Sequence, residues 1–513
     1  MNTPSPSSQA LPQYPESLWR ASTKLPTFPQ LTEDITVDVG IVGAGITGIT
    51  TAYILSKEGY KVALLDAGSI LQGTTGHTTA KITTQHGLIY DQLIQTLGEA
   101  QASKYYHANN EALQWITQTV KELQISCEWQ PEDAYVYAES EQSAGKLQKE
   151  FKAYEKLAIP GLWKEHLPIP LQMKAAIQLP GQAQFHPLEY LKTLVEAIIK
   201  AGGKIYEHTT VSNKLEGDRP FTVTTLDGEH HMTCQHLVSA SHFPFSDGGG
   251  FFFSRLYAER SYVVAMKPET PFAGGMYISV DEPTRSLRSA SWNGEQVVLV
   301  GGESHKTGQG ICTYQHYENL EQFGEKVLGN KGIPFRWSTQ DLVTLDKVPF
   351  IGQITSKAEG MYVATGFAKW GMTTSAVAAK LITDQIQGRD NPYSDLFSPS
   401  RFNANPDVKN FVVQNANVAK ELITGKVGIV YTQADELEKD SGSVVKHHGK
   451  RAGAYRDPDG NLHLVDTTCT HMGCEVEWNE GERTWDCPCH GSRFGYDGDV
   501  IEGPAQKPLT KLS

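Results

Sequence analysis

Two short segments near the C-terminus carry a set of metal-binding side chains that few folds can hold. Residues 469–490 contain four cysteines and two histidines, more ligands than the four that tetrahedral zinc needs. A [2Fe–2S] cluster in which two imidazoles replace two thiolates on one iron uses two cysteines and two histidines. The spacings C-x-H and C-x-x-H each supply one cysteine and one histidine. We therefore assign Cys469 and Cys487 to one iron, and His471 and His490 to the other.

The remaining cysteines, Cys474 and Cys489, lie one on each segment and are free to close a disulfide. Residue by residue, both segments resemble the Rieske iron–sulfur family; a zinc ribbon with spare cysteines is the alternative. Ser492 stands where high-potential members carry a serine that hydrogen-bonds a bridging sulfide, and residues 503–505 resemble the family's proline loop. Phe494 replaces their tyrosine donor, so we expect a potential below the respiratory type.

A glycine-rich turn dominates the N-terminal part of the chain. Residues 37–42 predict a short apolar strand, and Gly43-Ala44-Gly45-Ile46-Thr47-Gly48 follows at once. Helical spacing then runs from Ile46 to Glu58, and residues 61–65 predict a second strand that ends at Asp66, 18 residues past Gly48. This is a complete βαβ dinucleotide-binding unit, with the pyrophosphate at the helix N-terminus and the acid on the ribose.

The motif alone does not distinguish NAD from FAD. We find no second G-x-G-x-x-G in a βαβ context, and a flavin reductase that uses a pyridine nucleotide carries two such sites, which disfavours NADH as the donor. Three further segments resemble the D-amino-acid-oxidase-like (DAO) family of FAD-dependent amine and amino-acid oxidoreductases. They are Gly73–Ala80, the stretch from His186 to Val211, and residues 348–373. The resemblance implies FAD as the cofactor.

Within that family the first segment closes over the pyrophosphate and flavin, the second contacts adenine, and the third places a helix N-terminus at the flavin. We expect a strand over residues 361–365, a turn over 366–371 and a helix over 373–387. The helix dipole would favour the negative charge of the reduced ring. The residues expected to contact FAD are Gly43, Ala44, Gly45, Ile46, Thr47, Gly48, Asp66, Ala67, Thr75, Gly76, His77, Thr78, Val211, Gly366, Trp370, Gly371, Met372 and Thr373.

These motifs divide the chain of 513 residues into four parts. We expect an irregular lead-in over residues 1–35 and an FAD-dependent oxidoreductase domain over 36–390. A linker with a short helix in its second half would span 391–420, and a Rieske domain 421–513. The fold class is a Rossmann-like α/β FAD-binding domain of the glutathione-reductase type with an inserted mixed-sheet substrate domain. A small all-β domain with a turn at residues 457–460 follows it.

Composition limits the partners. A net charge of −13 argues against nucleic acid, and no run of about 18 apolar residues predicts a transmembrane helix. The N-terminus shows no apolar core of a secretory signal. Cys127, Cys234 and Cys312 are scattered and are expected to be buried thiols, which together with the missing signal predicts a cytoplasmic location.

The combination predicts a dehydrogenase that oxidises a small amine or amino acid and passes single electrons through the cluster to an external acceptor, a protein or a quinone. The alternative is an electron-transfer or redox-sensing module without a substrate; a Rieske oxygenase ranks last because it needs a 2-His-1-carboxylate iron. Residues 210–345 favour the enzyme, since an electron carrier needs no such sheet. Weak catalytic candidates are Lys369, Arg285, Arg288, Tyr262 and Tyr277; both arginines are more typical of surface positions, and both tyrosines suit a core equally well.

The sequence also raises the question of whether His77 is bonded covalently to the flavin. Members of the family that resemble dimethylglycine dehydrogenase carry a histidine in a similar loop, bonded to the flavin 8α-methyl group. In this chain Gly76 replaces a bulky residue and Lys81 follows where a small one is usual. A histidine that only hydrogen-bonds near the flavin is the interpretation we favour over a covalent link.

Overall fold

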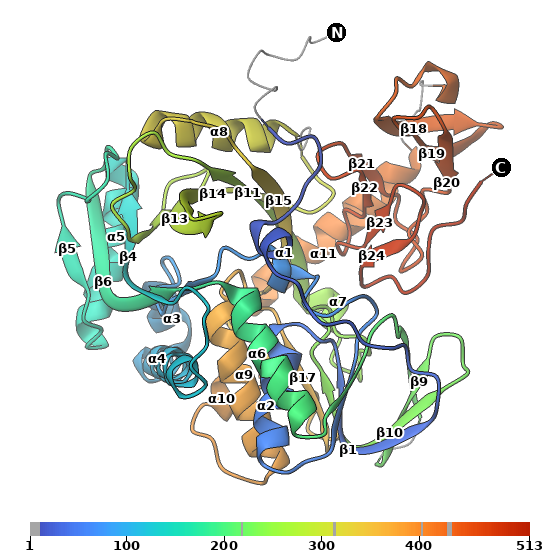
Figure 1. The fold of residues 1–513 in the computed structure, drawn as a ribbon, viewed down its shortest axis with the longest axis horizontal. Helices are drawn as coiled ribbons and strands as arrows, with labels where there is room; N and C mark the ends of the chain where they lie inside the picture. The colour runs from blue at the N-terminus through green and yellow to red at the C-terminus, as the bar shows by residue number, and fades with distance from the viewer. Residues whose placement is uncertain (1–10, 217–218, 311–313, 402–403, 428–432, 513) are drawn as a thin grey trace.

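The structure is a computed structural model that describes residues 11–512 except 217–218, 311–313, 402–403 and 428–432. Two large sheets with their helices occupy residues 35–397, and a small β domain at the C-terminal end packs beside them (Figure 1). The expected fold class is confirmed. Of the scattered cysteines, Cys127 and Cys234 are buried thiols as expected, whereas Cys312 lies outside the described residues.

The first sheet is the dinucleotide-binding sheet. Its core strands are parallel, and the predicted βαβ unit forms within a residue or two of the expected bounds. In spatial order the strands are β16 (Phe350–Gln353), β17 (Met361–Thr365), β10 (His231–Ser239), β1 (Ile35–Val42), β2 (Val62–Leu65) and β7 (Lys204–Tyr206). In addition, β9 (Phe221–Thr225) pairs with β10, and β8 (Val211–Glu216) pairs with β9. The helices that pack over it are α2 (Ile46–Lys57), α6 (Pro187–Lys200) and α9 (Gly371–Ile386).

The second sheet is mixed, as expected for the substrate side. In spatial order its strands are β15 (Phe335–Thr344), β11 (Leu256–Met266), β14 (Glu295–Lys306), β13 (Arg285–Trp292), β12 (Met276–Ser279), β4 (Gln130–Ala138), β6 (Ala175–Gln184) and β3 (Lys81–Ile82), with β5 (Leu162–Lys164) beside β6. The helices α3 (Tyr90–Leu97), α4 (Glu99–Glu122), α5 (Glu141–Lys156) and α8 (Tyr314–Leu328) complete this part. One hydrophobic core joins both sheets, because strands of each contribute buried side chains to it.

The C-terminal domain consists of two small antiparallel sheets. They are β18 (Ser441–His447), β19 (Lys450–Arg456) and β20 (Leu462–Val465), and then β21 (Glu477–Asn479), β22 (Thr484–Asp486), β23 (Arg493–Gly495) and β24 (Val500–Glu502). The turn expected at residues 457–460 joins β19 to β20. A 3-10 turn, η3 (Ala434–Glu436), precedes the domain.

Two expectations about the connecting segments need correction. The linker holds α10 (Ser394–Phe397) and then α11 (Ala404–Val427), a helix of 24 residues instead of a short one. The lead-in is not wholly irregular, because Leu18–Ser22 forms α1, whose N-cap Ser17 accepts a hydrogen bond from the Arg20 amide. Its first ten residues lie outside the described part. Among the described residues, no helix is both long and apolar enough to cross a membrane.

Candidate functional site

The glycines of the βαβ turn are required by close backbone contacts. Gly43 has φ +103°, and a Cβ there would lie 2.5 Å from the Ala240 carbonyl oxygen. A Cβ at Gly48 would collide with the carbonyl of Gly43, so the helix and the turn could not approach. The backbone therefore leaves the N-terminus of α2 open toward a phosphate, as a dinucleotide cofactor requires.

Thr75 lies against that helix N-terminus, where the sequence placed it. Its Oγ1 accepts a hydrogen bond from the Ile46 amide at 3.0 Å, and a Cβ on Gly45 would come within 3.2 Å of the same oxygen. The loop after β2 thus reaches the phosphate end of the cradle, and the geometry fits FAD in this place.

Asp66 ends β2, and backbone amides hold its carboxylate. Oδ2 accepts from Ala44 at 2.7 Å and Oδ1 from Gly68 at 2.9 Å. Burial raises the pKa of Asp66 despite these two amide donors. A residue that the sequence analysis missed, Glu207, lies at the end of β7 beside it. Glu207 accepts from the amides of Phe28 and Ile70, each at 2.8 Å, and so fastens the lead-in to the loop after Asp66. Adenosine ribose binding by Asp66 stays a prediction.

The loop around His77 is a 3-10 turn, η2 (Thr74–His77). The imidazole Nδ1 donates to the Gly73 carbonyl at 2.9 Å, and burial lowers the pKa of His77, so its neutral form carries the lone pair on Nε2. Gly76 has no room for a side chain, because a Cβ would lie 2.6 Å from the Leu71 carbonyl oxygen. The small residues expected in this loop are therefore needed for its packing.

The lead-in contributes to this loop, which the sequence analysis did not foresee. Ser17 Oγ donates to the Gly76 carbonyl at 2.5 Å, and Trp19 Nε1 donates to the Thr78 carbonyl at 2.7 Å. Ser17 and Trp19 are both fully buried. Residues far upstream of the βαβ unit thus hold the segment that the family resemblance places on the flavin.

The third segment has the predicted strand–turn–helix form. Gly366 turns the chain at φ +76°, and α9 begins two residues after Lys369. Lys369 is neither an isolated surface lysine nor an unpaired cation, because its ammonium lies 2.9 Å from Glu259 Oε2 and donates to Ser304 Oγ at 2.6 Å. Trp370 stacks on the buried ring of His86 with centroids 4.6 Å apart.

The expectation that both arginine candidates are surface residues is wrong. Arg288 is 2% exposed and donates to the carbonyls of Ser289, Ala80 and Phe185. It therefore reaches the loop that follows Asp66. Arg285 is also largely buried, but its Nη2 pairs with Glu303 Oε1 at 2.5 Å, in a separate cluster. The sequence pattern could not show this, because pairing with a distant acid or carbonyl decides whether an arginine can be buried.

The tyrosine candidates both belong to the core. Tyr262 and Tyr277 are fully buried; the Tyr262 hydroxyl lies 2.8 Å from His305 Nε2, and that of Tyr277 donates to the Gly274 carbonyl. Lys81, next to Ala80, is a charged residue that was not proposed for the site. Enclosure by protein, with Arg288 nearby, lowers its pKa to about 7. Within the described part of the chain, nothing forms a hydrogen bond or ion pair with its ammonium.

The predicted cluster ligands come together in the C-terminal domain. Cys469 and Cys487 are buried thiols in mutual contact. The rings of His471 and His490 lie 5.0 Å apart at an interplanar angle of 89°. Both Nδ1 atoms are buried and meet no hydrogen-bond partner among the described residues. Two thiols in contact and two neighbouring imidazoles with unpaired nitrogens supply the donor set of a two-histidine [2Fe–2S] centre.

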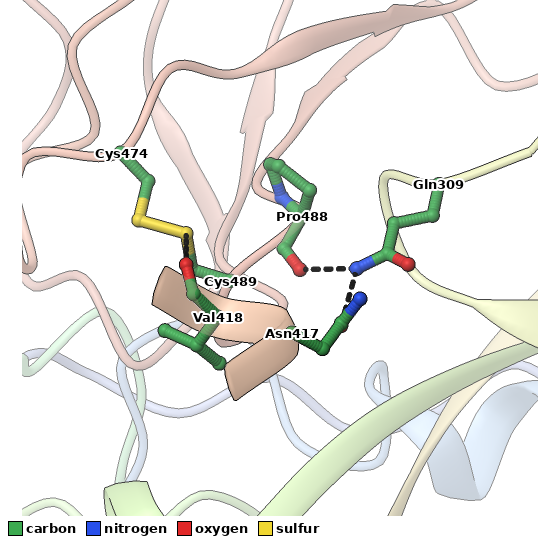
Figure 2. The surroundings of a disulfide bond; sticks show 6 residues. All are labelled: Gln309, Asn417, Val418, Cys474, Pro488 and Cys489. Carbon is green, nitrogen blue, oxygen red and sulfur yellow. Dashed lines mark hydrogen bonds between the residues drawn. A yellow bond between two sulfur atoms is a disulfide. The ribbon is translucent and has the colours of Figure 1, made fainter. Parts of the chain in front are cut away.

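The other two cysteines form the expected disulfide. Cys474 and Cys489 are bonded, with Cα atoms 6.5 Å apart (Figure 2). The sulfurs of both and of Cys487 lie within 4.8 Å of one another, but sulfurs in a disulfide are not thiolate ligands. The bridge instead ties the two ligand loops together, and Figure 2 shows Val418 of α11 beside it.

Ser492 and Phe494, the residues expected to tune the cluster, are both buried; their effect on the potential stays a prediction. Ser492 is fully buried, contacts Cys469, and accepts a hydrogen bond from the Ala505 amide at 3.0 Å, which joins the proline loop to the cluster loop. Phe494 is also fully buried and offers no hydrogen-bond donor.

Comparisons with known proteins agree with this geometry. Residues 38–385 match the family described as FAD dependent oxidoreductase (DAO), and residues 428–513 match the Rieske [2Fe-2S] domain. The class is thus an FAD-dependent oxidoreductase with an iron–sulfur domain. The chain belongs to the DAO family and carries a C-terminal Rieske domain; its cofactors are FAD and a [2Fe–2S] cluster.

Relatives extend along most of the chain. YhfW of Bacillus subtilis strain 168, whose name describes a Rieske 2Fe-2S iron-sulfur protein, is 51% identical over 500 residues, covering 98% of each chain. Gamma-glutamylputrescine oxidoreductase of Escherichia coli K12 is 22% identical over 83% of this chain and 99% of its own. The crystal structure of glycine oxidase from Geobacillus kaustophilus superposes with a TM-score of 0.61 at 18% identity, covering 72% and 99% of the two chains, and shows the same fold.

Proposed function

We propose that this protein is a dehydrogenase that oxidises the C–N bond of a small amine or amino acid and delivers the electrons singly, through its own Rieske domain, to an external one-electron acceptor. FAD supplies hydride acceptance and the cluster supplies one-electron transfer. In the overall balance the substrate becomes an imine, two electrons reduce two equivalents of acceptor, and the protons go to solvent.

The observation that carries the proposal is the direct contact between the cluster loop and the oxidoreductase domain. A Cβ on Gly491 would lie 2.5 Å from the Ala258 Cβ, and a Cβ on Gly308 would lie 2.6 Å from the Pro488 amide nitrogen. Gln309 also donates to the Pro488 carbonyl at 3.0 Å (Figure 2). These contacts place the backbone of the cluster loop directly against the oxidoreductase domain.

Charged side chains hold the two domains in this arrangement. Arg260, which is fully buried in β11, lies 3.6 Å from Asp486 of the Rieske domain. Tyr317 donates to Glu482 at 2.5 Å, and Arg336 donates to the Gly481 carbonyl at 2.8 Å. Buried polar contacts of this kind specify one relative placement of two surfaces.

On the substrate side, Lys81 and Arg288 favour a carboxylate-bearing substrate. Arg288 is buried and Lys81, beside it, is partly exposed; the two cations repel each other, and an anion between them would remove that cost. Because burial holds the pKa of Lys81 near 7, the cation is lost as the pH rises above that value. Carboxylate binding should therefore weaken at higher pH. The names of the relatives, a glycine oxidase and a gamma-glutamylputrescine oxidoreductase, are consistent with an amine or amino-acid substrate.

The second candidate function is a redox module without a small-molecule substrate. The substrate-side sheet, which holds Lys81 and Arg288, favours the enzyme, because an electron carrier needs neither the sheet nor the cations.

The test is an anaerobic titration of the holoprotein with matched pairs of compounds, each an amino acid and the amine that lacks its carboxylate. We expect flavin bleaching followed by the electron paramagnetic resonance signal of the reduced cluster. Lys81→Met should raise KM for the amino acid and leave that of the amine unchanged. If dithionite bleaches the flavin and no compound does, the enzyme proposal fails in favour of the redox module.

A cluster-free full-length variant, Cys487→Ala, tests the relay. It should still be bleached by substrate but should lose turnover with a protein acceptor. Unchanged turnover with that acceptor would exclude the cluster from the electron path.

A further inference from the structure

One strand separates the loop expected to lie on the flavin from the loop that carries the cluster ligands. This strand, β15, pairs with β11 along its length and contacts η2, the turn that contains His77. Trp337 on β15 donates its Nε1 hydrogen to the His77 carbonyl at 2.8 Å. The same strand reaches the Rieske domain, as the position of β15 beside the C-terminal domain in Figure 1 indicates.

Gln340 is the residue of β15 that bonds to both loops. Thr74 Oγ1, in η2, donates to its backbone carbonyl at 2.9 Å. Its side-chain Nε2 donates to the carbonyl of Gly491 at 2.9 Å. Gly491 directly follows the expected iron ligand His490. Two hydrogen bonds and one residue therefore connect the flavin loop to the cluster loop.

The surroundings of Gln340 fix its side chain in this orientation. The residue is 2% exposed. Its Oε1 accepts from Thr307 Oγ1 at 2.8 Å and from Arg260 Nη2 at 3.3 Å. Since the Arg260 guanidinium can only donate and the Gly491 carbonyl can only accept, the amide oxygen must face Arg260 and the amide nitrogen must face Gly491. Gly491 has φ +78°, and a Cβ there would lie 2.5 Å from the Ala258 Cβ, so the cluster loop packs closely against β11 at this residue.

We propose that Gln340 is a positioning residue that fixes the flavin loop and the cluster loop against each other, so that an electron crosses β15 within one chain and without movement of the Rieske domain. The inference rests on the proposed function. In the step, the reduced flavin loses one electron, one cluster iron goes from ferric to ferrous, and any proton released passes to solvent. Gln340 itself is neither oxidised nor reduced.

The experiment is flash photoreduction of the holoprotein by 5-deazariboflavin with EDTA as the electron donor, which needs neither substrate nor acceptor. Flavin reoxidation and cluster reduction are followed by absorbance. Gln340→Glu is nearly isosteric, keeps an acceptor for Thr307 and Arg260, and turns an oxygen toward the Gly491 carbonyl in place of the donor. We expect intramolecular transfer to slow severalfold, because without the bond to Gly491 the cluster loop is no longer held against β15.

Two readouts separate positioning from a general structural defect. The resonance spectrum of the cluster should be that of the wild type, because no ligand changes; the cluster potential is measured in the same protein, because a carboxylate near the ligand loop lowers it and the two transfer rates must be compared at known driving force. The matched control is Gln353→Glu: Gln353 donates to the Thr355 carbonyl at 2.8 Å within β16 and its turn, and among the described residues it forms no hydrogen bond with the Rieske domain. Its transfer rate should equal that of the wild type.

The outcomes are distinguishable. If the wild type shows no transfer from flavin to cluster, the relay of the proposed function fails and this inference with it. If the wild type transfers and Gln340→Glu does so at the same rate, only the role of Gln340 is overturned. If the Gln340→Glu protein lacks its cluster, Thr74→Val, which removes the bond on the flavin side, takes its place: a slower rate supports the inference and an unchanged rate overturns it.

Discussion

Replacement of Arg260 by methionine should loosen the Rieske domain from the oxidoreductase domain. The Arg260 side chain has no solvent exposure and lies where two anionic groups, Asp486 and Glu482, face two guanidiniums. Its Nε is 3.6 Å from Asp486 Oδ2, too far for a hydrogen bond, so the interaction with that carboxylate is one of charge. Its Nη1 donates to Ser338 Oγ at 2.8 Å.

The stability lost in Arg260→Met depends on the charged partners that Asp486 keeps. Loss of one partner from a buried ion pair costs about 3–5 kcal/mol, because the other charge stays buried. Here Asp486 keeps Arg493, whose Nε lies 3.3 Å from Oδ1, so we expect the lower end, about 3 kcal/mol. This is a little over a hundredfold in the equilibrium between docked and undocked domains, at about 1.4 kcal/mol per factor of ten.

The stability lost in Arg260→Met should depend on pH. Burial would raise the pKa of Asp486, but the charges of Arg260 and Arg493 outweigh it and hold the pKa below its ordinary value. A depressed pKa contributes stability that is full above the unfolded pKa, about 3.9, and that is lost as the pH falls through the folded value. The difference between wild type and variant should therefore be complete at neutral pH and should shrink below about pH 4.

The assay is urea unfolding of the holoprotein. Cluster absorbance and flavin fluorescence are recorded separately, because a protein of several domains need not unfold in one transition. The control is Arg219→Met, which removes an exposed pair with Glu359 and should change stability by less than about 1 kcal/mol. The reasoning is refuted if Arg260→Met behaves like the control, or if its loss is as large in acid as at neutral pH.

Three further predictions concern the cofactors. Phe494→Tyr should raise the cluster potential by adding a donor beside a ligand sulfur, and protein-film voltammetry that finds a fall or no change would contradict this. His490→Cys should abolish the Rieske-type resonance spectrum or lower the potential, because imidazole ligation raises it; iron-free, zinc-containing protein would instead support the zinc alternative. Acid precipitation should leave a colourless pellet with all FAD in the supernatant, because we expect His77 to lie near the flavin without a covalent bond; a yellow pellet would mean a covalent flavin.

The sequence predicted those parts of the site that local chemistry determines. Cys469, His471, Cys487 and His490 are few residues apart, and no other side-chain type binds iron in that way. Gly43 and Gly48 are likewise set by contacts within one βαβ unit. Such features depend on spacing along the chain, and spacing is visible in a sequence. The strand Met361–Thr365 was predicted to the residue for the same reason.

The errors arose where distant segments determine the outcome. Arg288 resembles a surface arginine until carbonyls of residues 80, 185 and 289 are seen around it. The long helix α11 begins in a segment rich in asparagine that carries no strong helical pattern. Lys81 follows a loop of small residues, and its surroundings depend on distant strands of the second sheet, β6 and the strand of Arg288. The sequence pattern does not show which distant residues will become such partners.

The orientation of the cluster is the clearest case of this limit. The motif states which atoms bind iron, but it does not state which way the two loops face. In the structure the ring of His490 lies 6.4 Å from that of Phe253, and the ring of His471 lies 6.2 Å from that of Phe243. Both phenylalanines belong to the segment between β10 and β11, more than 200 residues earlier in the chain. Neither would attract notice in the sequence, yet together with Gln340 and Arg260 they turn the ligand loops toward the oxidoreductase domain. The inward-facing cluster is thus a property of the docked pair of domains, because the contacts that orient it are absent from either domain alone.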